Sequence, residues 1–206
     1  MQFVSGHVES LKGNFCDYVG EKYGGKKRIL TGPVLPEPGE VNLEDKWEKW
    51  LAKFDPGSVV YCAFGTQVTL EKKQFQELVL GLELTGLPFL VALKTPYGVS
   101  SIEEALPEGF QERIGERGGD LWGNGDQIPN ARLLAEDLGV AIEVERDENG
   151  GFSKEDVSKA VLNVMDNDSK LGQTIRNNHQ SWMETILKPN WGSDYIENFI
   201  QQLNML

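Results

Sequence analysis

One stretch, residues 58–93, constrains the fold more than any other part of the chain. It opens with an apolar, β-branched run at residues 59–64, which predicts a strand that is buried on both faces. An amphipathic helix follows, and residues 89–93 form a second apolar run. A strand, a helix and a strand in this order form a βαβ unit, so we expect an α/β fold with a parallel sheet.

The helix of this unit has predictable ends. Thr69 is suited to cap its first turn, where Glu71 would also complement the helix dipole. Gly86 stands where a helix end favours a positive φ, and Pro88 prevents continuation. The predicted apolar stripe of the helix comprises Leu70, Phe75, Leu78, Val79 and Leu82.

Other segments follow familiar patterns. Prolines at positions 33, 36 and 38 indicate an extended linker. Ser153 and Asp156 form a variant capping box that predicts a helix to about residue 165. Residues 140–144 alternate between apolar and polar and predict a strand, whereas the glycine-rich residues 118–127 predict a loop. Further helices are expected at residues 11–23, 44–54, 111–116, 130–138, 171–187 and 193–203.

Composition narrows the function. The chain has 206 residues and a net charge of −12, which argues against nucleic-acid binding. No apolar run is long enough for a membrane span, and no signal peptide is evident, so we expect a cytoplasmic protein. Two cysteines in different elements suggest neither a disulfide framework nor a metal site.

Several stretches, taken together, resemble the plant UDP-dependent glycosyltransferases of the B-type two-domain fold. They are most similar to the branch that adds a second sugar to flavonoid or anthocyanin glycosides. The order and spacing of the stretches carry the resemblance. The matching residues are FCDYVG at 15–20, LTGPVLP at 30–36, SVVYCAFGT at 58–66, FQELVLGLELTGLPFL at 75–90, LPEGFQER at 106–113, GDQ at 125–127 and FSK at 152–154.

The resemblance implies a fold and a domain division. Residues 37–206 would form the C-terminal, Rossmann-like domain that binds a UDP-sugar, with a parallel sheet flanked by helices. Residues 1–36 would contain the end of the preceding region and the interdomain linker. The domain would be shortened, with an internal deletion near residues 118–125.

Two pairs of residues acquire roles through the resemblance. Gly65 and Thr66 would approach the donor diphosphate, because glycine permits close backbone contact and amides near a helix N-terminus suit an anion. Asp126 and Gln127 would hold hydroxyls of the transferred sugar, since a carboxylate and an amide can accept and donate hydrogen bonds. From the residues alone, we interpret the first pair as a tight turn and the second as a solvated loop.

Essential parts of the family pattern are missing. Only residues 119–124 stand where the family carries several tens of residues that contact uracil, ribose and diphosphate. The family's catalytic base is a histidine in the N-terminal domain. His7 lies in a segment that matches another region, and His179 lies on a polar helix face, so we expect both to be surface residues and predict no catalytic residue.

The implied function is transfer of a sugar from a UDP-sugar to a hydroxyl of a plant secondary metabolite such as a flavonoid glycoside. Neither cofactor nor metal is expected, and the partners would be the UDP-sugar and a hydroxylated acceptor. The isolated chain is expected to be inactive. The alternative is a truncated, spliced or engineered domain that serves as a scaffold or interaction module. Apolar surface exposed at the deletion would favour self-association.

Overall fold

The βαβ unit predicted from residues 58–93 is present. The computed structural model describes residues 21–22, 24, 43–64, 68–121, 135, 138–188 and 191–205. Strand β1 (Val60–Ala63) leads through helix α3 (Lys72–Leu84) to strand β2 (Phe89–Ala92). The two strands are parallel, with Val60 opposite Phe89. The α/β parallel-sheet prediction is therefore confirmed.

A third strand, β3 (Gly118–Leu121), extends the sheet where the sequence predicts a loop. It pairs with β2 in parallel, with Gly118 opposite Phe89, and the sheet order is β1-β2-β3. The loop prediction is wrong for these four residues because the free edge of β2 supplies backbone partners that override a weak local propensity. Glycine at position 118 is also required sterically, since a Cβ there would overlap the Ile114 side chain.

Strand β1 is covered on one face only. Val60 and Cys62 are half-buried and pack against the apolar core, whereas the Tyr61 side chain is 63% exposed and Ala63 is also exposed. The prediction of a strand buried on both faces is therefore wrong. The prediction assumes a sheet with helices on both faces. The described residues cover β1 only on the face toward α3.

The start of α3 also differs from the prediction. The N-cap residue is Glu71, which is extended and makes no side-chain cap hydrogen bond. Thr69 lies two residues before this N-cap. The Tyr97 amide donates to the Leu70 carbonyl at 3.0 Å, and Glu71 forms a parallel bridge with Tyr97. This pairing holds residues 70 and 71 extended and delays the first turn. The predicted end is confirmed, because Gly86 has a φ of 70°.

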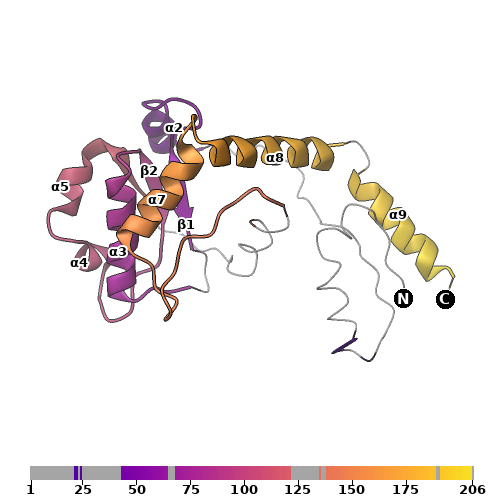
Figure 1. Ribbon diagram of the computed structural model, residues 1–206, viewed down its shortest axis with the longest axis horizontal. Helices are drawn as coiled ribbons and strands as arrows, with labels where there is room; N and C mark the ends of the chain where they lie inside the picture. Colours follow the sequence, from indigo (N-terminus) through magenta and orange to yellow (C-terminus); the bar gives the residue numbers. More distant parts are fainter. Residues whose placement is uncertain are drawn as a thin grey trace.

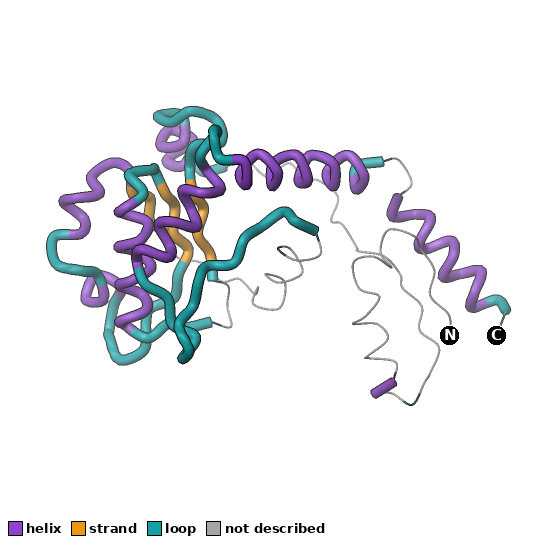
Figure 2. Tube along the Cα trace, in the orientation of Figure 1, coloured by secondary structure: helices purple, strands orange, loops and turns teal. Residues whose placement is uncertain are grey.

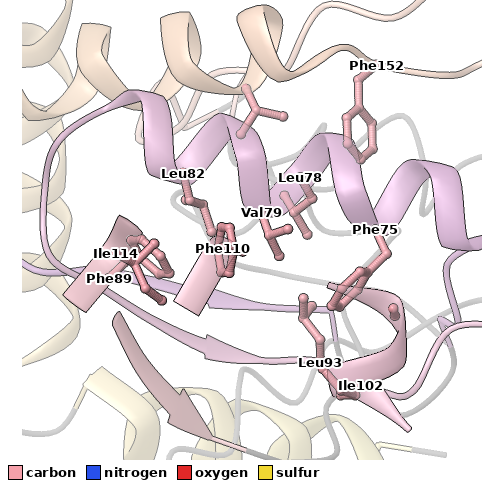
Figure 3. Packing of buried hydrophobic residues seen from close by; sticks show 12 residues of the cluster. Phe75, Leu78, Val79, Leu82, Phe89, Leu93, Ile102, Phe110, Ile114 and Phe152 are labelled. Carbon is pink, nitrogen blue, oxygen red and sulfur yellow. The ribbon is translucent and has the colours of Figure 1, made fainter. Parts of the chain in front are cut away.

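The apolar core lies between α3 and the sheet (Figure 3). Short helices α4 (Ile102–Ala105) and α5 (Phe110–Ile114) close it, followed by the 3-10 turn η1 (Gly115–Arg117). The Phe89 and Phe110 ring centroids are 6.4 Å apart. The most buried members of the core are Phe75, Leu78, Val79, Leu82, Phe89, Leu93, Ile102, Ala105, Phe110, Ile114, Phe152 and Val157.

Helix α7 (Lys154–Met165) packs against α3 at close range (Figure 1). Its predicted capping box is confirmed: the Asp156 amide donates to Ser153 Oγ, and the Ser153 amide donates to the Asp156 carboxylate. The close approach depends on Gly81 of α3, because a Cβ there would lie 2.6 Å from Val157 Cβ and 2.8 Å from the Lys154 carbonyl oxygen.

Residues 140–144 do not form the predicted strand. They run as an irregular segment, with Val144 packed against the core. An alternating sequence becomes a strand only beside a partner strand, and this segment pairs with no strand that the structure describes. The apolar pattern therefore does not indicate strand pairing here, and among these five residues Glu143 alone is exposed.

The remaining helices lie outside the α3–α7 layer. Helix α2 (Asp45–Leu51) is shorter than predicted, and Trp50 Nε1 donates to the Glu116 carbonyl at 3.0 Å. Helix α8 (Lys170–Ile186) leads away from the sheet to α9 (Trp191–Leu203), as Figure 2 shows. Both helices confirm the predicted C-terminal helical region. The predicted linker at residues 33–38 lies outside the described residues.

Candidate functional site

The predicted donor-site residues follow two strands of the sheet. Gly65 and Thr66 come after β1, and Asp126 and Gln127 come after β3; all four lie outside the described residues. Because β1, β2 and β3 are parallel, their carboxyl ends lie at one edge of the sheet. Ligands of open α/β sheets bind at this edge. The ends of β1 and β3, which precede the two predicted pairs in the sequence, therefore lie at the same edge.

The loop after β2 occupies this edge as well. It runs from Leu93 to Ser101, and the Tyr97 pairing with Leu70 and Glu71 attaches it to the start of α3. Its end is fixed by Ser101, whose side chain accepts from the Glu104 amide at the first turn of α4. Sequence reasoning missed the Tyr97 contact, since no local pattern links residues that far apart. The contact fixes Leu70 and Glu71, the last residues before α3 begins.

Cys62 lies in β1, three residues before Gly65. Burial raises the pKa of its thiol to about 12, so the side chain stays protonated at neutral pH. A protonated, half-buried thiol is a poor nucleophile. Cys62 therefore acts as a small apolar residue that packs against the core.

A polar groove lies where α3, α7 and the turn at residues 147–151 meet. Its polar groups are largely paired with one another. The Gln74 amide bonds both to the Phe152 carbonyl at 3.2 Å and to the Phe152 amide at 3.1 Å. Glu77 accepts from the Lys154 amide at 2.7 Å. These bonds fasten α7 to α3, so we interpret the groove as structural.

His179 is the histidine that the structure describes. It is exposed on α8, as predicted, while His7 lies outside the described residues. Within the described ranges, no group of three His, Cys, Asp or Glu side chains is placed to hold a metal ion. No helix among those described is both long enough and apolar enough to cross a membrane.

Comparisons with known proteins point to one group of enzymes. UDP-glycosyltransferase 79B6 of Arabidopsis thaliana is 45% identical over 239 residues, covering 96% of this chain and 52% of the relative. The Arabidopsis anthocyanidin 3-O-glucoside 2'''-O-xylosyltransferase is 42% identical, covering 93% and 50%. The chain spans about half the length of the curated relatives it matches. No protein-family model matches.

The aligned stretch is longer than the chain itself. The 239 positions aligned with UDP-glycosyltransferase 79B6 exceed the 206 residues of the whole chain by 33. At least that many positions of the relative therefore face no residue of this chain. A deficit of this size agrees with the predicted internal deletion.

Solved structures show the same fold. A UDP-glucosyltransferase from Polygonum tinctorium has a TM-score of 0.71 at 20% identity, covering 94% of this chain and 52% of that chain. Phytolacca americana UGT2 has a TM-score of 0.69 at 20% identity, covering 94% and 53%. These likenesses confirm the predicted B-type architecture in shortened form. The chain is thus a shortened homologue of about one half of a plant UDP-glycosyltransferase.

Proposed function

We propose that this chain derives from the UDP-sugar-binding half of a glycosyltransferase that acts on plant secondary metabolites such as flavonoid glycosides. The identity of 45% to a curated UDP-glycosyltransferase over nearly the whole chain carries this proposal. A relative named for xylosyl transfer to an anthocyanidin glucoside supports the acceptor class. The parallel sheet supports a ligand site at its carboxyl edge.

The proposed reaction is an inverting displacement. An acceptor hydroxyl oxygen bonds to the anomeric carbon of the donor sugar while the bond from that carbon to the UDP oxygen breaks. UDP leaves with the electron pair, and a base takes the hydroxyl proton. Gly65 and Thr66 would contact the diphosphate, and Asp126 and Gln127 the sugar hydroxyls. The reaction needs neither metal nor cofactor, because the UDP-sugar is itself the activated substrate.

We further propose that the isolated chain binds its donor weakly and does not turn over. UDP-glycosyltransferase 79B6 has at least 33 aligned positions that this chain lacks, and the resemblance assigns the uracil, ribose and diphosphate contacts to such a segment. No catalytic base is assigned to this chain. Gly65, Thr66, Asp126 and Gln127 would then be the surviving part of a larger site.

A non-catalytic scaffold or interaction module is the second candidate. One observation favours it: the α3–α7 layer is well packed without the missing segment. Phe75, Leu82 and Phe89 are each 2% exposed, and the capping box of α7 is complete. A domain with an intact core and an incomplete site can persist as a folded unit after its activity is lost.

Calorimetric titration with UDP and UDP-glucose tests the proposal. We expect absent or millimolar binding to the chain, and micromolar binding after the corresponding segment of UDP-glycosyltransferase 79B6 is inserted between Asn124 and Gly125. In that chimera, Asp126→Ala should abolish the gain from glucose but retain UDP binding. Asp194→Ala, at an exposed carboxylate on α9, is the matched control.

Two outcomes would contradict the proposal. Micromolar donor binding by the unaltered chain would overturn the incomplete-site claim, as would turnover of a flavonoid glycoside acceptor. A folded chimera that binds no UDP would overturn the claim that this edge of the sheet is a donor site. The scaffold alternative predicts that chimera and chain behave alike.

A further inference from the structure

The turn at residues 147–151, which leads into α7, contains an asparagine followed by a glycine. The chain has two such pairs, at residues 124–125 and 149–150, and the first lies outside the described residues. In an Asn-Gly pair the backbone nitrogen of the glycine can attack the side-chain carbonyl carbon of the asparagine, because glycine has no Cβ to obstruct the approach. The second pair is therefore a candidate for spontaneous covalent modification.

The reacting groups of this second pair are accessible. Asn149 and Gly150 are both exposed, and the Asn149 side chain forms no hydrogen bond with any residue that the structure describes. Gly150 has a φ of 80°, and a Cβ built on it would meet nothing within 4 Å. The Gly150 backbone therefore has room to rotate toward the Asn149 side chain.

Hydrogen bonds to Asp147 restrain the pair. The Gly150 amide donates to the Asp147 carbonyl at 2.9 Å, so this bond must open before the nitrogen can attack. The Asp147 carboxylate accepts from the Asn149 amide at 2.9 Å and from the Gly151 amide at 2.7 Å. These bonds lie in an exposed turn, where local opening costs far less free energy than global unfolding. The reaction should therefore occur in the folded chain, at a rate set by opening of this turn.

We propose that Asn149 is a site of spontaneous deamidation in the folded chain, with water as co-reactant, and that the product loosens the contact between α7 and α3. The Gly150 nitrogen loses its proton and bonds to Asn149 Cγ, while the bond from Cγ to Nδ2 breaks and ammonia leaves with that proton. Water then opens the resulting succinimide at either carbonyl carbon. One opening gives aspartate. The other gives isoaspartate, whose backbone runs through the former side chain and is longer by one carbon.

An isoaspartate at position 149 would act on α7 through Phe152. The Asp147 amide donates to the Gly151 carbonyl at 2.8 Å, so the two ends of the turn are paired across position 149. The turn is closely packed, since a Cβ on Gly151 would lie 2.9 Å from an Asp147 carboxylate oxygen. Phe152 follows directly, is 8% exposed, and bonds to Gln74 of α3 through its amide and its carbonyl. A longer backbone in the turn disturbs the pairing of its ends and should weaken this attachment.

Peptide mass spectrometry of the folded chain, after incubation in water enriched in heavy oxygen, tests the site. We expect the peptide that contains Asn149 to exchange an NH group for one heavy oxygen atom, and to contain both aspartate and isoaspartate. Asn149→Gln should not react, since its side chain is longer by one carbon and the ring that must close is larger. Asn167, at an exposed bend and followed by Asp168, is the internal control and should stay unmodified. An unmodified Asn149, or one that forms aspartate alone, would overturn the proposal.

Hydrogen exchange on the modified chain, separated from the unmodified chain by its added negative charge, tests the effect on α7. The Phe152 amide, which donates to Gln74, should exchange about tenfold faster, the equivalent of one hydrogen bond. Asn149→Asp adds the charge without lengthening the backbone, and should leave this amide unchanged. Unchanged exchange in the modified chain would overturn the claim about α7, as would an equal acceleration in Asn149→Asp. The proposal does not depend on the proposed function, because neither measurement involves a nucleotide.

Discussion

The two faces of the sheet differ in how much of the chain they need. On the face toward α3, Phe89 is 2% exposed, and the described helices that close the core, α3, α4, α5 and α7, lie within residues 72–165. On the other face of the neighbouring strand, Tyr61 is 63% exposed. The covered face is formed by elements that lie close together in the sequence. No element that the structure describes covers the open face of β1 at Tyr61.

One alanine substitution on each face of the sheet tests this difference most directly. Phe89→Ala should lower the free energy of unfolding by about 3–5 kcal/mol, because it removes a ring from a packed core. Tyr61→Ala should change it by about 0.5 kcal/mol or less, as exposed substitutions do. Urea denaturation at a protein concentration where the chain is monomeric measures both. Equal losses would show that the open face is covered after all.

The sequence patterns succeeded on the covered side because the relevant signals are local. The spacing of apolar residues in α3, the positive φ of Gly86 and the Ser153–Asp156 capping box each depend on residues within one element. Predictions failed where a distant partner decides. Tyr97 displaces the start of α3 from Thr69, and β2 turns residues 118–121 into a strand.

The candidate site could be predicted only through resemblance. No spacing rule distinguishes Gly65-Thr66 from an ordinary turn, or Asp126-Gln127 from a loop, and these residues lie outside those the structure describes. What the structure adds is the parallel pairing of β1, β2 and β3, which places the carboxyl ends of these strands at one edge. Their roles in donor binding stay predictions.

The buried and exposed sides of α3 should also differ in how well they tolerate substitution. Gly81→Ala should destabilise the chain by about 1–3 kcal/mol, since the new Cβ meets the Lys154 carbonyl as well as Val157 and the backbone must shift. Leu84→Ala, on the exposed side of the same helix, is the matched control and should have little effect. Thermal and urea unfolding measure both. A neutral Gly81→Ala would mean that the two helices are less tightly held than the packing indicates.

The cap of α7 supplies a smaller, pH-dependent effect. Ser153→Ala should cost about 1 kcal/mol at neutral pH through loss of the helix cap. Hydrogen bonds from Ser153 lower the pKa of Asp156 below its ordinary value. A lowered pKa stabilises the fold above the ordinary value, and this stabilisation is lost as the pH falls through the folded-state pKa. The difference between wild type and Ser153→Ala should therefore shrink below about pH 4. A difference that is constant from pH 7 to pH 3 would contradict the Asp156 part of this account.

The smallest effect should come from α2, where Trp50 donates a hydrogen bond to the turn η1. Trp50→Phe keeps a ring beside Phe54, whose centroid is 4.9 Å away, but removes the hydrogen bond to the Glu116 carbonyl. We expect a loss of about 0.5–1 kcal/mol or less in global stability, because the bond lies at an exposed site. Hydrogen exchange should reveal a larger local change, with faster exchange of the α2 amides and unchanged exchange in α3. This separation would show that α2 opens independently of the covered face, whereas parallel acceleration in both helices would make α2 part of the same cooperative unit.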